Sequence, residues 1–393
     1  MNQMYDFDTL IDRSTTGACK WVRRTEQEKK EGILALSVAD MELPVAPCVR
    51  EAVVHAAEHG IYGYTDPTDE YYDAVLSWMA SRHGIQATAQ NIVPISGVVA
   101  GLAIAIRAFS NPGDGIIIQT PVYSPFYSCI ELNDRRIEHC PLTLNDSGYH
   151  MDFSALEQCA KKDDVHLMIL CSPHNPVGRV WTKDELERLF AICRKNNVLV
   201  ISDEIHADIV FHGTHHAFPT LSHDAHMYSI TLTAPSKTFN VPGLQNANAF
   251  IFDETLLERF KMQARTDGFD NISYFGHAAS IAAYTGAGDW LEAVKAYIYA
   301  NYELLRDFLN ANMPQARLFP LEGTYLAWID FRYLSLTVEE LSAFIRNDAK
   351  WILTEGYCFG TDGEGFERIN LALPRAEFQK ALDHFLIAYQ NRF

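Results

Sequence analysis

Short runs of consecutive apolar residues recur through the middle of the chain. Apolar runs this short are typical of strands that are buried on both faces, as in a parallel sheet. Helical patterns at 98–109 and 183–195, the second capped by Thr182, lie between some of these runs. Strands are predicted at 92–95, 115–118, 136–140, 165–171, 198–202, 227–232 and 247–252. The alternation of strand and helix predicts an α/β fold with a mostly parallel, seven-stranded sheet.

The pattern changes after residue 253, where long helical stretches and short strands replace the regular alternation. Helices are predicted there at 254–262, 290–312, 338–348 and 375–390, and strands at 326–330 and 368–372. Two further helices are predicted near the N-terminus, around 49–59 and at 70–83. We therefore expect a large α/β domain, 51–288, and a small C-terminal α+β domain, 289–393, with the N-terminal segment, 1–50, packed against the small domain.

The composition is typical of a globular enzyme. Of 393 residues, 48% are hydrophobic and 21% are charged, and the formal net charge is −18. So acidic a chain is not expected to bind nucleic acid or an anionic membrane. The sequence shows no signal peptide and no apolar stretch near the ~18 residues of a membrane span. Its eight cysteines form no Cys-x-x-Cys pair. We expect a cytoplasmic protein with reduced thiols.

Polar turns follow three of the predicted strands, and each carries a residue with useful chemistry: Asn175, Asp203 and Lys237. Ligands of open parallel sheets bind at the carboxyl ends of strands, so an amide, a carboxylate and an amine are expected to converge on one crevice. Pyridoxal phosphate (PLP) needs such a set. A lysine forms a Schiff base with it, an acid lies against its pyridine nitrogen, and a donor binds its ring oxygen.

Each of these residues also has a plainer interpretation. A lysine after a strand is more often a solvated loop residue, but Pro235 and Ser236 predict a tight, inward-facing turn. There the Lys237 amine, once displaced by substrate, becomes a base for the Cα proton. Asp203 is either a cap or ion-pair partner, or a carboxylate that keeps the pyridine nitrogen protonated. Asn175 is either a turn residue or a donor to the ring oxygen.

Four more residues are candidates for the same site. His206 lies about one helical turn after the aspartate and would face the same ligand, although a lone histidine is more often structural. Gly97 and Val98 stand where a predicted strand meets a helix, so their backbone N–H groups would suit a phosphate; such turns often need a glycine in any case. Tyr123 is equally a ring that stacks on the cofactor and a core aromatic.

A metal site is not expected. Histidines cluster between residues 212 and 226, but their spacing is irregular and no carboxylate partners are obvious. The sequence also has no phosphate-loop or dinucleotide fingerprint.

Six short segments together resemble one known family. They are VADM at 38–41, GIYGYT at 60–65, PVYSPF at 121–126, SPHNP at 172–176, GRVWT at 178–182 and SDEIHAD at 202–208. With the order of Asn175, Asp203 and Lys237, they resemble fold-type I PLP enzymes of the aminotransferase class I/II superfamily, and within it the MalY/PatB-type cystathionine β-lyases. The resemblance runs from about residue 5 to the C-terminus. It implies the aspartate aminotransferase-like fold.

The resemblance also implies roles for individual residues. For the cofactor it implies Lys237 as the Schiff-base lysine, Asp203 at the pyridine nitrogen, Asn175 and His206 at the ring oxygen, Tyr123 stacked on the ring, and Gly97, Val98 and Ser236 near the phosphate. Tyr64 is expected to reach the phosphate of a neighbouring subunit, which implies a homodimer with shared active sites. Arg368, otherwise a surface ion-pair residue, is expected to grip the substrate α-carboxylate bidentately. Ala39 and Tyr64 are further expected substrate contacts.

The chain departs from the aminotransferase pattern at three positions. Ala234 stands where many aminotransferases carry a phosphate-binding serine, and Gln245 where they carry a phosphate-binding arginine. The phosphate site is therefore expected to be less cationic, with Ser236 or Thr233 as substitutes. His206 replaces the usual ring-oxygen tyrosine, which fits the β-lyase branch.

The predicted activity is that of a PLP-dependent carbon–sulfur β-lyase. It would cleave cystathionine and related cysteine S-conjugates to a thiol (homocysteine), pyruvate and ammonia. An aminotransferase would use the same residues and differ only in the fate of the carbanion, so it remains the alternative. A third possibility is a regulatory, partner-binding protein on this fold, since some relatives in the branch are associated with transcriptional control.

Overall fold

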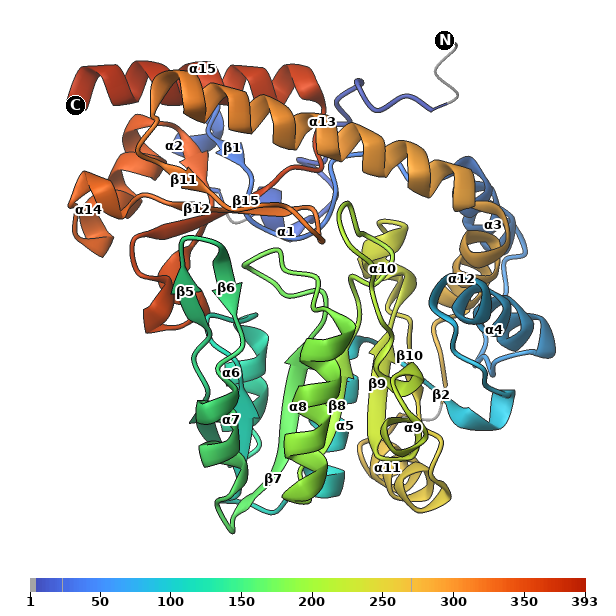
Figure 1. Cartoon of the computed structure of the whole chain (residues 1–393). Coiled ribbons are helices and arrows are strands. Elements are labelled where there is room, and N and C mark those ends of the chain that lie inside the picture. The colour runs from blue at the N-terminus through green and yellow to red at the C-terminus, as the bar shows by residue number, and fades with distance from the viewer. Residues whose placement is uncertain (1–4, 23, 270) are drawn as a thin grey trace.

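A seven-stranded sheet forms the centre of the molecule (Figure 1). The computed structural model describes residues 5–22, 24–269 and 271–393. The sheet has the order β2-β10-β9-β8-β7-β3-β4, and β10 alone runs antiparallel to its neighbours. Its strands are β2 (Ile92–Ile95), β3 (Gly115–Ile118), β4 (Arg136–His139), β7 (Val165–Cys171), β8 (Leu199–Asp203), β9 (Ser229–Thr233) and β10 (Ala247–Phe250). The mostly parallel, seven-stranded sheet is thus confirmed.

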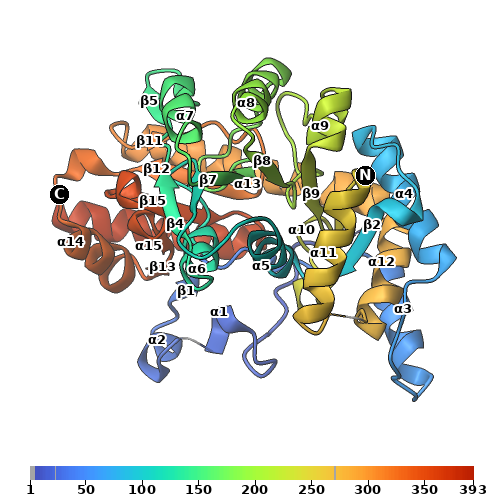
Figure 2. The same cartoon turned by 90° about the horizontal axis from the view of Figure 1, so that it is seen from below.

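Helices cover both faces of this sheet, because consecutive side chains of each strand point to opposite sides. In β3, Ile116 and Ile118 pack toward one set of helices, whereas Ile117 packs toward the other. The first set is α5 (Val98–Phe109), α6 (Pro125–Glu131) and α11 (Glu254–Thr266). The second is α7 (Phe153–Ala160), α8 (Lys183–Lys195) and the short α9 (His223–Met227). Figure 2 shows the two layers on either side of the strands.

A smaller antiparallel sheet, in the order β11-β12-β15-β14, lies above the first in the view of Figure 1. Its strands are β11 (Arg317–Leu318), β12 (Leu326–Asp330), β14 (Thr354–Glu355) and β15 (Phe366–Asn370). Two long helices, α13 (Gly288–Asn312) and α15 (Arg375–Arg392), run side by side over it. In the N-terminal segment, β1 (Leu34–Ala35) pairs in parallel with β13 (Trp351–Ile352). The N-terminal segment therefore contacts the C-terminal part of the chain; the boundaries at residues 50 and 288 stay predictions.

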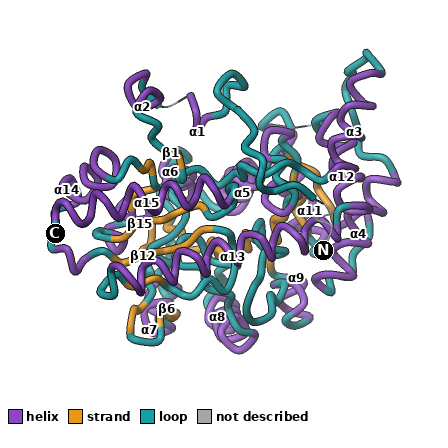
Figure 3. The backbone as a smooth tube through the Cα atoms, turned by 90° about the horizontal axis from the view of Figure 1, so that it is seen from above, coloured by secondary structure: helices purple, strands orange, loops and turns teal. Residues whose placement is uncertain are grey.

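Three helices, α3 (Pro47–Glu58), α4 (Asp69–His83) and α12 (Tyr274–Gly286), pack together at one end of the molecule (Figure 3). The remaining elements are short: α1 (Cys19–Val22), α2 (Glu26–Lys30), the hairpin β5 (Thr143–Asn145) and β6 (Gly148–His150), α10 (Pro235–Thr238) and α14 (Val338–Ala343). In the part of the chain that the structure describes, no helix is both long and apolar enough to cross a membrane.

Several predicted elements differ at their ends. The strand predicted at 227–232 begins two residues later, because Met227 still belongs to α9. The hydroxyl of Ser222 starts that helix by accepting from the N–H of Ala225 at 3.0 Å. The helix predicted at 338–348 changes to a π-helical turn after Ala343. Apolar residues at helix ends and strand ends look alike in sequence, so such boundaries are hard to predict.

Candidate active site

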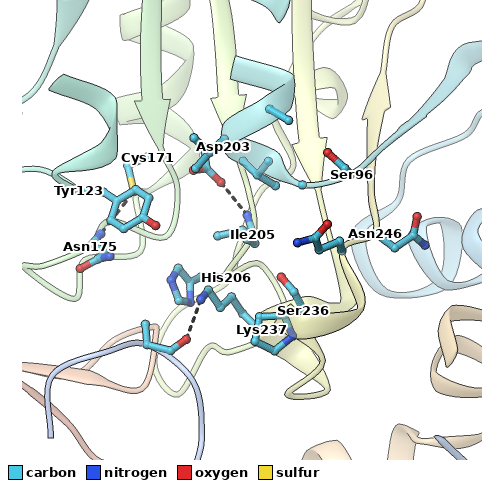
Figure 4. A pocket seen from close by; sticks show the side chains of 17 residues that line it. Ser96, Tyr123, Cys171, Asn175, Asp203, Ile205, His206, Ser236, Lys237 and Asn246 are labelled. Atoms are coloured by element: carbon cyan, nitrogen blue, oxygen red, sulfur yellow. Dashed lines mark hydrogen bonds between the residues drawn. The ribbon is translucent and has the colours of Figure 1, made fainter. Parts of the chain in front are cut away.

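One pocket lies where the carboxyl ends of β7, β8 and β9 meet the N-terminus of α5 (Figure 4). Most residues predicted for the site line it: Ala39, Gly97, Val98, Tyr123, Asn175, Asp203, His206, Ser236 and Lys237. They come from segments nearly two hundred residues apart. The expectation that an amide, a carboxylate and an amine converge at this edge of the sheet is thus confirmed for the positions of these side chains.

Asp203 is the last residue of β8 and is buried. One carboxylate oxygen accepts from the backbone N–H of Ile205 at 3.1 Å. Burial raises the pKa of Asp203 to about 7, the backbone hydrogen bond opposing it. A positive charge beside this side chain would lower its pKa again and favour the carboxylate, because an opposite charge stabilises the ionised form. Asp203 is therefore suited to hold a cationic group in the pocket.

Lys237 lies in α10, which begins directly after β9. Its Nζ donates to the backbone carbonyl of Ala39 at 2.6 Å (Figure 4). Burial, together with the positive charge of Arg368, lowers the pKa of Lys237 to about 8. About one tenth of the amine is therefore uncharged at pH 7, and about half at pH 8. Only that form is a nucleophile or a base.

Arg368, in β15, is buried and contacts the pocket through Asn175. Its Nη1 donates to Oδ1 of Asn175 at 3.0 Å, and its Nη2 donates to the carbonyl of Ser37 at 2.8 Å. Arg368 is not itself a lining residue, and among the described residues its Nε has no hydrogen-bond partner. Because Oδ1 of Asn175 is occupied by the guanidinium, the NH₂ group is the end of that amide left to donate elsewhere.

His206 and Tyr123 face the pocket from two sides of it (Figure 4). Burial lowers the pKa of His206 to about 3, so its ring is neutral near neutral pH. Within the described residues, its buried Nδ1 has no hydrogen-bond partner. Burial also raises the pKa of Tyr123, which keeps the phenol protonated. Both side chains therefore present uncharged rings to any ligand.

The other end of the pocket is the first turn of α5. Gly97 is the N-cap residue, and no side chain caps the helix. A Cβ added at Gly97 would meet nothing within 4 Å, so there is open space beside the start of the helix. Free N–H groups at a helix N-terminus form a natural anion site. The pocket is also lined by Ser96, Val99 and Ala100, which were not predicted. Their position beside Gly97 in the sequence could have identified them as pocket residues.

Two residues were expected to replace the missing phosphate-binding side chains, and the structure places only one of them in the pocket. Ser236 lines the pocket, whereas Thr233 does not. The hydroxyl of Thr233 is buried inside β9, so this candidate was wrong as a pocket contact. Gln245 also lines the pocket, in a left-handed backbone conformation (φ 51°), and so does Asn246. Asn246 was missed, because nothing in its sequence context distinguishes it from an ordinary loop residue.

Tyr64 lies outside the pocket. Its side chain is 98% exposed, and Ile61 and Tyr62 of the same segment are also exposed. In a single chain, Tyr64 therefore contacts neither the predicted cofactor site nor the predicted substrate site.

The residues present fit PLP in chemical type. The open helix start suits a phosphate, the buried Asp203 suits a basic ring nitrogen, and the Lys237 amine suits an aldehyde. The NH₂ group of Asn175 and the Nδ1 of His206, which has no hydrogen-bond partner among the described residues, are further polar groups at this site.

Comparison with known proteins gives full-length matches. The aminotransferase class I and II profile matches residues 31–385. Cystathionine beta-lyase PatB of Bacillus subtilis is 37% identical over 378 residues, which cover 96% of this chain and 98% of that protein. Protein MalY of Escherichia coli is 33% identical over 381 residues, which cover 96% and 97%.

A solved structure agrees with the sequence matches. The crystal structure of cystalysin from Treponema denticola, which contains a pyridoxal 5′-phosphate cofactor, superposes with a TM-score of 0.95 at 38% identity and covers 99% of each chain. The aspartate aminotransferase-like fold expected from the sequence is therefore confirmed. This chain belongs to the aminotransferase class I and II family.

Proposed function

We propose that this protein is a PLP-dependent carbon–sulfur β-lyase, which cleaves cystathionine and related cysteine S-conjugates to a thiol, pyruvate and ammonia. The observation that carries the proposal is the meeting of Lys237, Asp203 and Asn175 in one buried pocket. The relative named cystathionine beta-lyase, 37% identical over nearly the whole chain, supports the lyase over other reactions of the family.

The proposed cofactor contacts follow from the chemistry of the lining residues. The first turn of α5, with Ser236, would hold the phosphate, and Asn175 and His206 would lie at the ring oxygen. Tyr123 would stack on the ring, and Asp203 would keep a proton on the ring nitrogen. When bound, PLP supplies a carbonyl carbon that condenses with amines and a cationic ring that accepts the electron pair left at Cα.

The proposed roles in the reaction belong to three side chains. Arg368 would bind the substrate carboxylate and so orient the bond from Cα to hydrogen. Lys237, largely uncharged at mildly alkaline pH, would take the proton from Cα. Asp203, by holding a positive ring nitrogen, would make that proton easier to remove. Loss of the β-thiolate then yields the thiol, and hydrolysis of the remainder yields pyruvate and ammonia.

We also propose that two copies share their active sites. The exposure of Ile61, Tyr62 and Tyr64 on one segment supports an interface there, because large apolar side chains grouped on a surface are typical of protein contacts. In such a homodimer, Tyr64 would reach the phosphate and substrate in the partner's pocket. Within its own chain Tyr64 lies outside the pocket.

The test is a product assay on the purified holoenzyme. Cystathionine is supplied without any 2-oxo acid, and pyruvate and homocysteine are followed together. A parallel reaction contains an amino acid and a 2-oxo acid. The proposal predicts pyruvate and thiol in the first reaction. Amino transfer in the second, with no pyruvate in the first, would establish the aminotransferase instead.

A further inference from the structure

A largely buried segment, residues 37–43, passes the pocket beside Lys237, and we call it the strap. Its backbone is bent, and successive carbonyl groups in it accept from different partners. The carbonyls of Val38 and Asp40 both accept from Nδ2 of Asn370, each at 2.7 Å. The carbonyl between them, that of Ala39, accepts from Nζ of Lys237 at 2.6 Å. The Asn370 amide therefore helps to fix where the Ala39 carbonyl points, together with Nζ of Lys20, which also donates to the Asp40 carbonyl, at 3.0 Å.

The Asn370 amide is itself held. Its Oδ1 accepts from the backbone N–H of Ala372 at 2.8 Å, which leaves the NH₂ end for the strap. Asn370 is 2% exposed, so these bonds do not compete with bulk water. It lies two residues after Arg368 on the same face of β15, and Arg368 donates to Ser37 of the strap. The same strand thus holds both the strap and the proposed carboxylate-binding residue.

The other end of the strap is held from the opposite part of the molecule. Nδ2 of Asn240 donates to the carbonyls of Met41 and Leu43, at 3.1 and 2.9 Å. Its Oδ1 accepts from the N–H of Met41 at 2.9 Å. Asn240 follows Lys237 by only three residues. The strap therefore links the turn that carries the lysine to the strand that carries Arg368.

The Ala39 carbonyl has a second donor. The hydroxyl of Tyr325, a residue that is 1% exposed, donates to it at 2.7 Å. A carbonyl oxygen has two lone pairs, so the phenol and the amine occupy both. Charged groups also surround the amine: Arg368, Asp40, Asp203 and Lys20 all act on it. These charged side chains influence the amine through their charge, whereas the Ala39 carbonyl accepts its hydrogen bond.

We propose that Asn370 and Tyr325 are positioning residues for Lys237, which act through the Ala39 carbonyl: Asn370 aims this carbonyl at the amine, and Tyr325 shares it. The inference rests on the proposed function for its catalytic consequence. A preorganised acceptor holds the amine in place whenever it is free, as it must be when it acts as a base.

The test compares Asn370→Ala with Asn301→Ala, a matched control. Asn301 is also buried, and its Nδ2 likewise donates to two carbonyls two residues apart, those of Leu371 and Leu373, at 2.9 Å each. Both variants lose a buried amide bridge, and both are expected to unfold at lower temperature than wild type. A large change in the reactivity of the Lys237 amine is expected for Asn370→Ala alone.

The first measurement is the rate at which acetic anhydride acylates Lys237 in the cofactor-free protein, followed by peptide mass spectrometry with exposed Lys161 as the internal reference. An acceptor favours the ammonium form, so its loss should speed acylation of Lys237 in Asn370→Ala by about ten-fold, the effect expected for one hydrogen bond to a charged group. In the holoenzyme, kcat should fall by a similar factor with little change in KM. Asn301→Ala leaves both the Asn370 amide and the strap in place, so it should change both measurements by much less than Asn370→Ala does.

A second pair keeps the inference testable if Asn370→Ala does not fold. Tyr325→Phe leaves the Ala39 carbonyl to the amine alone, so acylation of Lys237 should become slower. Tyr302→Phe is the control, because its buried hydroxyl also donates to a backbone carbonyl, that of Phe319, at 3.1 Å. Equal acylation of Lys237 in all these proteins and wild type would overturn the inference. If wild type released no pyruvate from cystathionine, the proposed function would fail, yet the acylation rates would still decide the positioning roles.

Discussion

Arg368 donates a hydrogen bond from Nη1 to Oδ1 of Asn175 at 3.0 Å, across an interval of 193 residues in the sequence. The bond connects β15 of the smaller sheet to the turn after β7 of the larger one. It also fixes which end of the Asn175 amide can donate into the pocket. The proposed substrate-binding and cofactor-binding groups are therefore in direct contact.

Replacement of Arg368 by lysine should weaken substrate binding strongly. An ammonium group cannot donate to Asn175 and Ser37 at once and also present two parallel N–H groups to a carboxylate. We expect kcat/KM for cystathionine to fall by about ten- to a hundred-fold, mainly through KM. Steady-state kinetics measure this, with the exposed Arg306→Lys as the control. An unchanged KM would show that Arg368 does not bind the substrate.

Asp203 should make the stability of the cofactor-free protein depend on pH. Burial raises its pKa from 3.8 to about 7, so the folded chain binds this proton more tightly than the unfolded chain. The folded state therefore loses stability as pH rises from about 4 to about 7, and the whole cost remains at higher pH. Three pKa units correspond to as much as about 4 kcal/mol.

The variant Asp203→Asn removes this cost and keeps an oxygen for the N–H of Ile205. We expect it to exceed the wild-type free energy of unfolding at pH 8 and to lose that advantage toward pH 4. Urea unfolding of the cofactor-free proteins at both pH values measures the difference. Cystathionine cleavage by the variant should fall by at least about a hundred-fold, because the ring nitrogen loses its anion. A stability difference that did not vary with pH would contradict the assignment.

Gln245 offers a gain of function. It lines the pocket where many aminotransferases carry an arginine. Gln245→Arg would add a cation at the proposed phosphate site and should tighten PLP binding by about ten-fold. Equilibrium dialysis of PLP against the cofactor-free protein measures this, with Gln245→Met as an uncharged control of similar length. Equal dissociation constants for all three proteins would place the phosphate elsewhere.

Tyr64 gives a test of shared sites. Neither Tyr64→Ala nor Lys237→Ala is expected to cleave cystathionine at an appreciable rate. When the two are unfolded together and refolded in equal amounts, half of the dimers are hybrids, each with one intact site. Activity should then return to about one quarter of the wild-type value. Mixtures that stay inactive although hybrid dimers form would contradict the proposed role of Tyr64 across the interface.

The residues that follow buried strands were predictable from the sequence. Asn175, Asp203 and Lys237 each lie at most five residues after a short apolar run, and parallel strands bring such positions to one edge. The resemblance to known enzymes added Arg368 and Tyr64, whose proposed roles depend on a second sheet and on a second chain. Neither can be derived from strand patterns.

The strap could not be predicted in this way. Ala39 contributes a backbone carbonyl, which leaves no trace in the identity of its side chain. Asn240 and Asn370 look like ordinary turn and strand-end residues, and their partners are carbonyls 197 to 332 residues away in sequence. Thr233 failed for the converse reason, because its place in the chain beside the lysine turn did not reveal that its side chain is buried at the end of β9, outside the pocket.

The most direct test of the proposed function counts turnovers. The holoenzyme is incubated with excess cystathionine and no 2-oxo acid, and pyruvate is measured per active site over time. A β-lyase regenerates itself in each cycle, so the account predicts pyruvate and homocysteine in equal amounts over many turnovers, and none with Lys237→Ala. Reaction that stops after one amino group per site, without homocysteine, would contradict it.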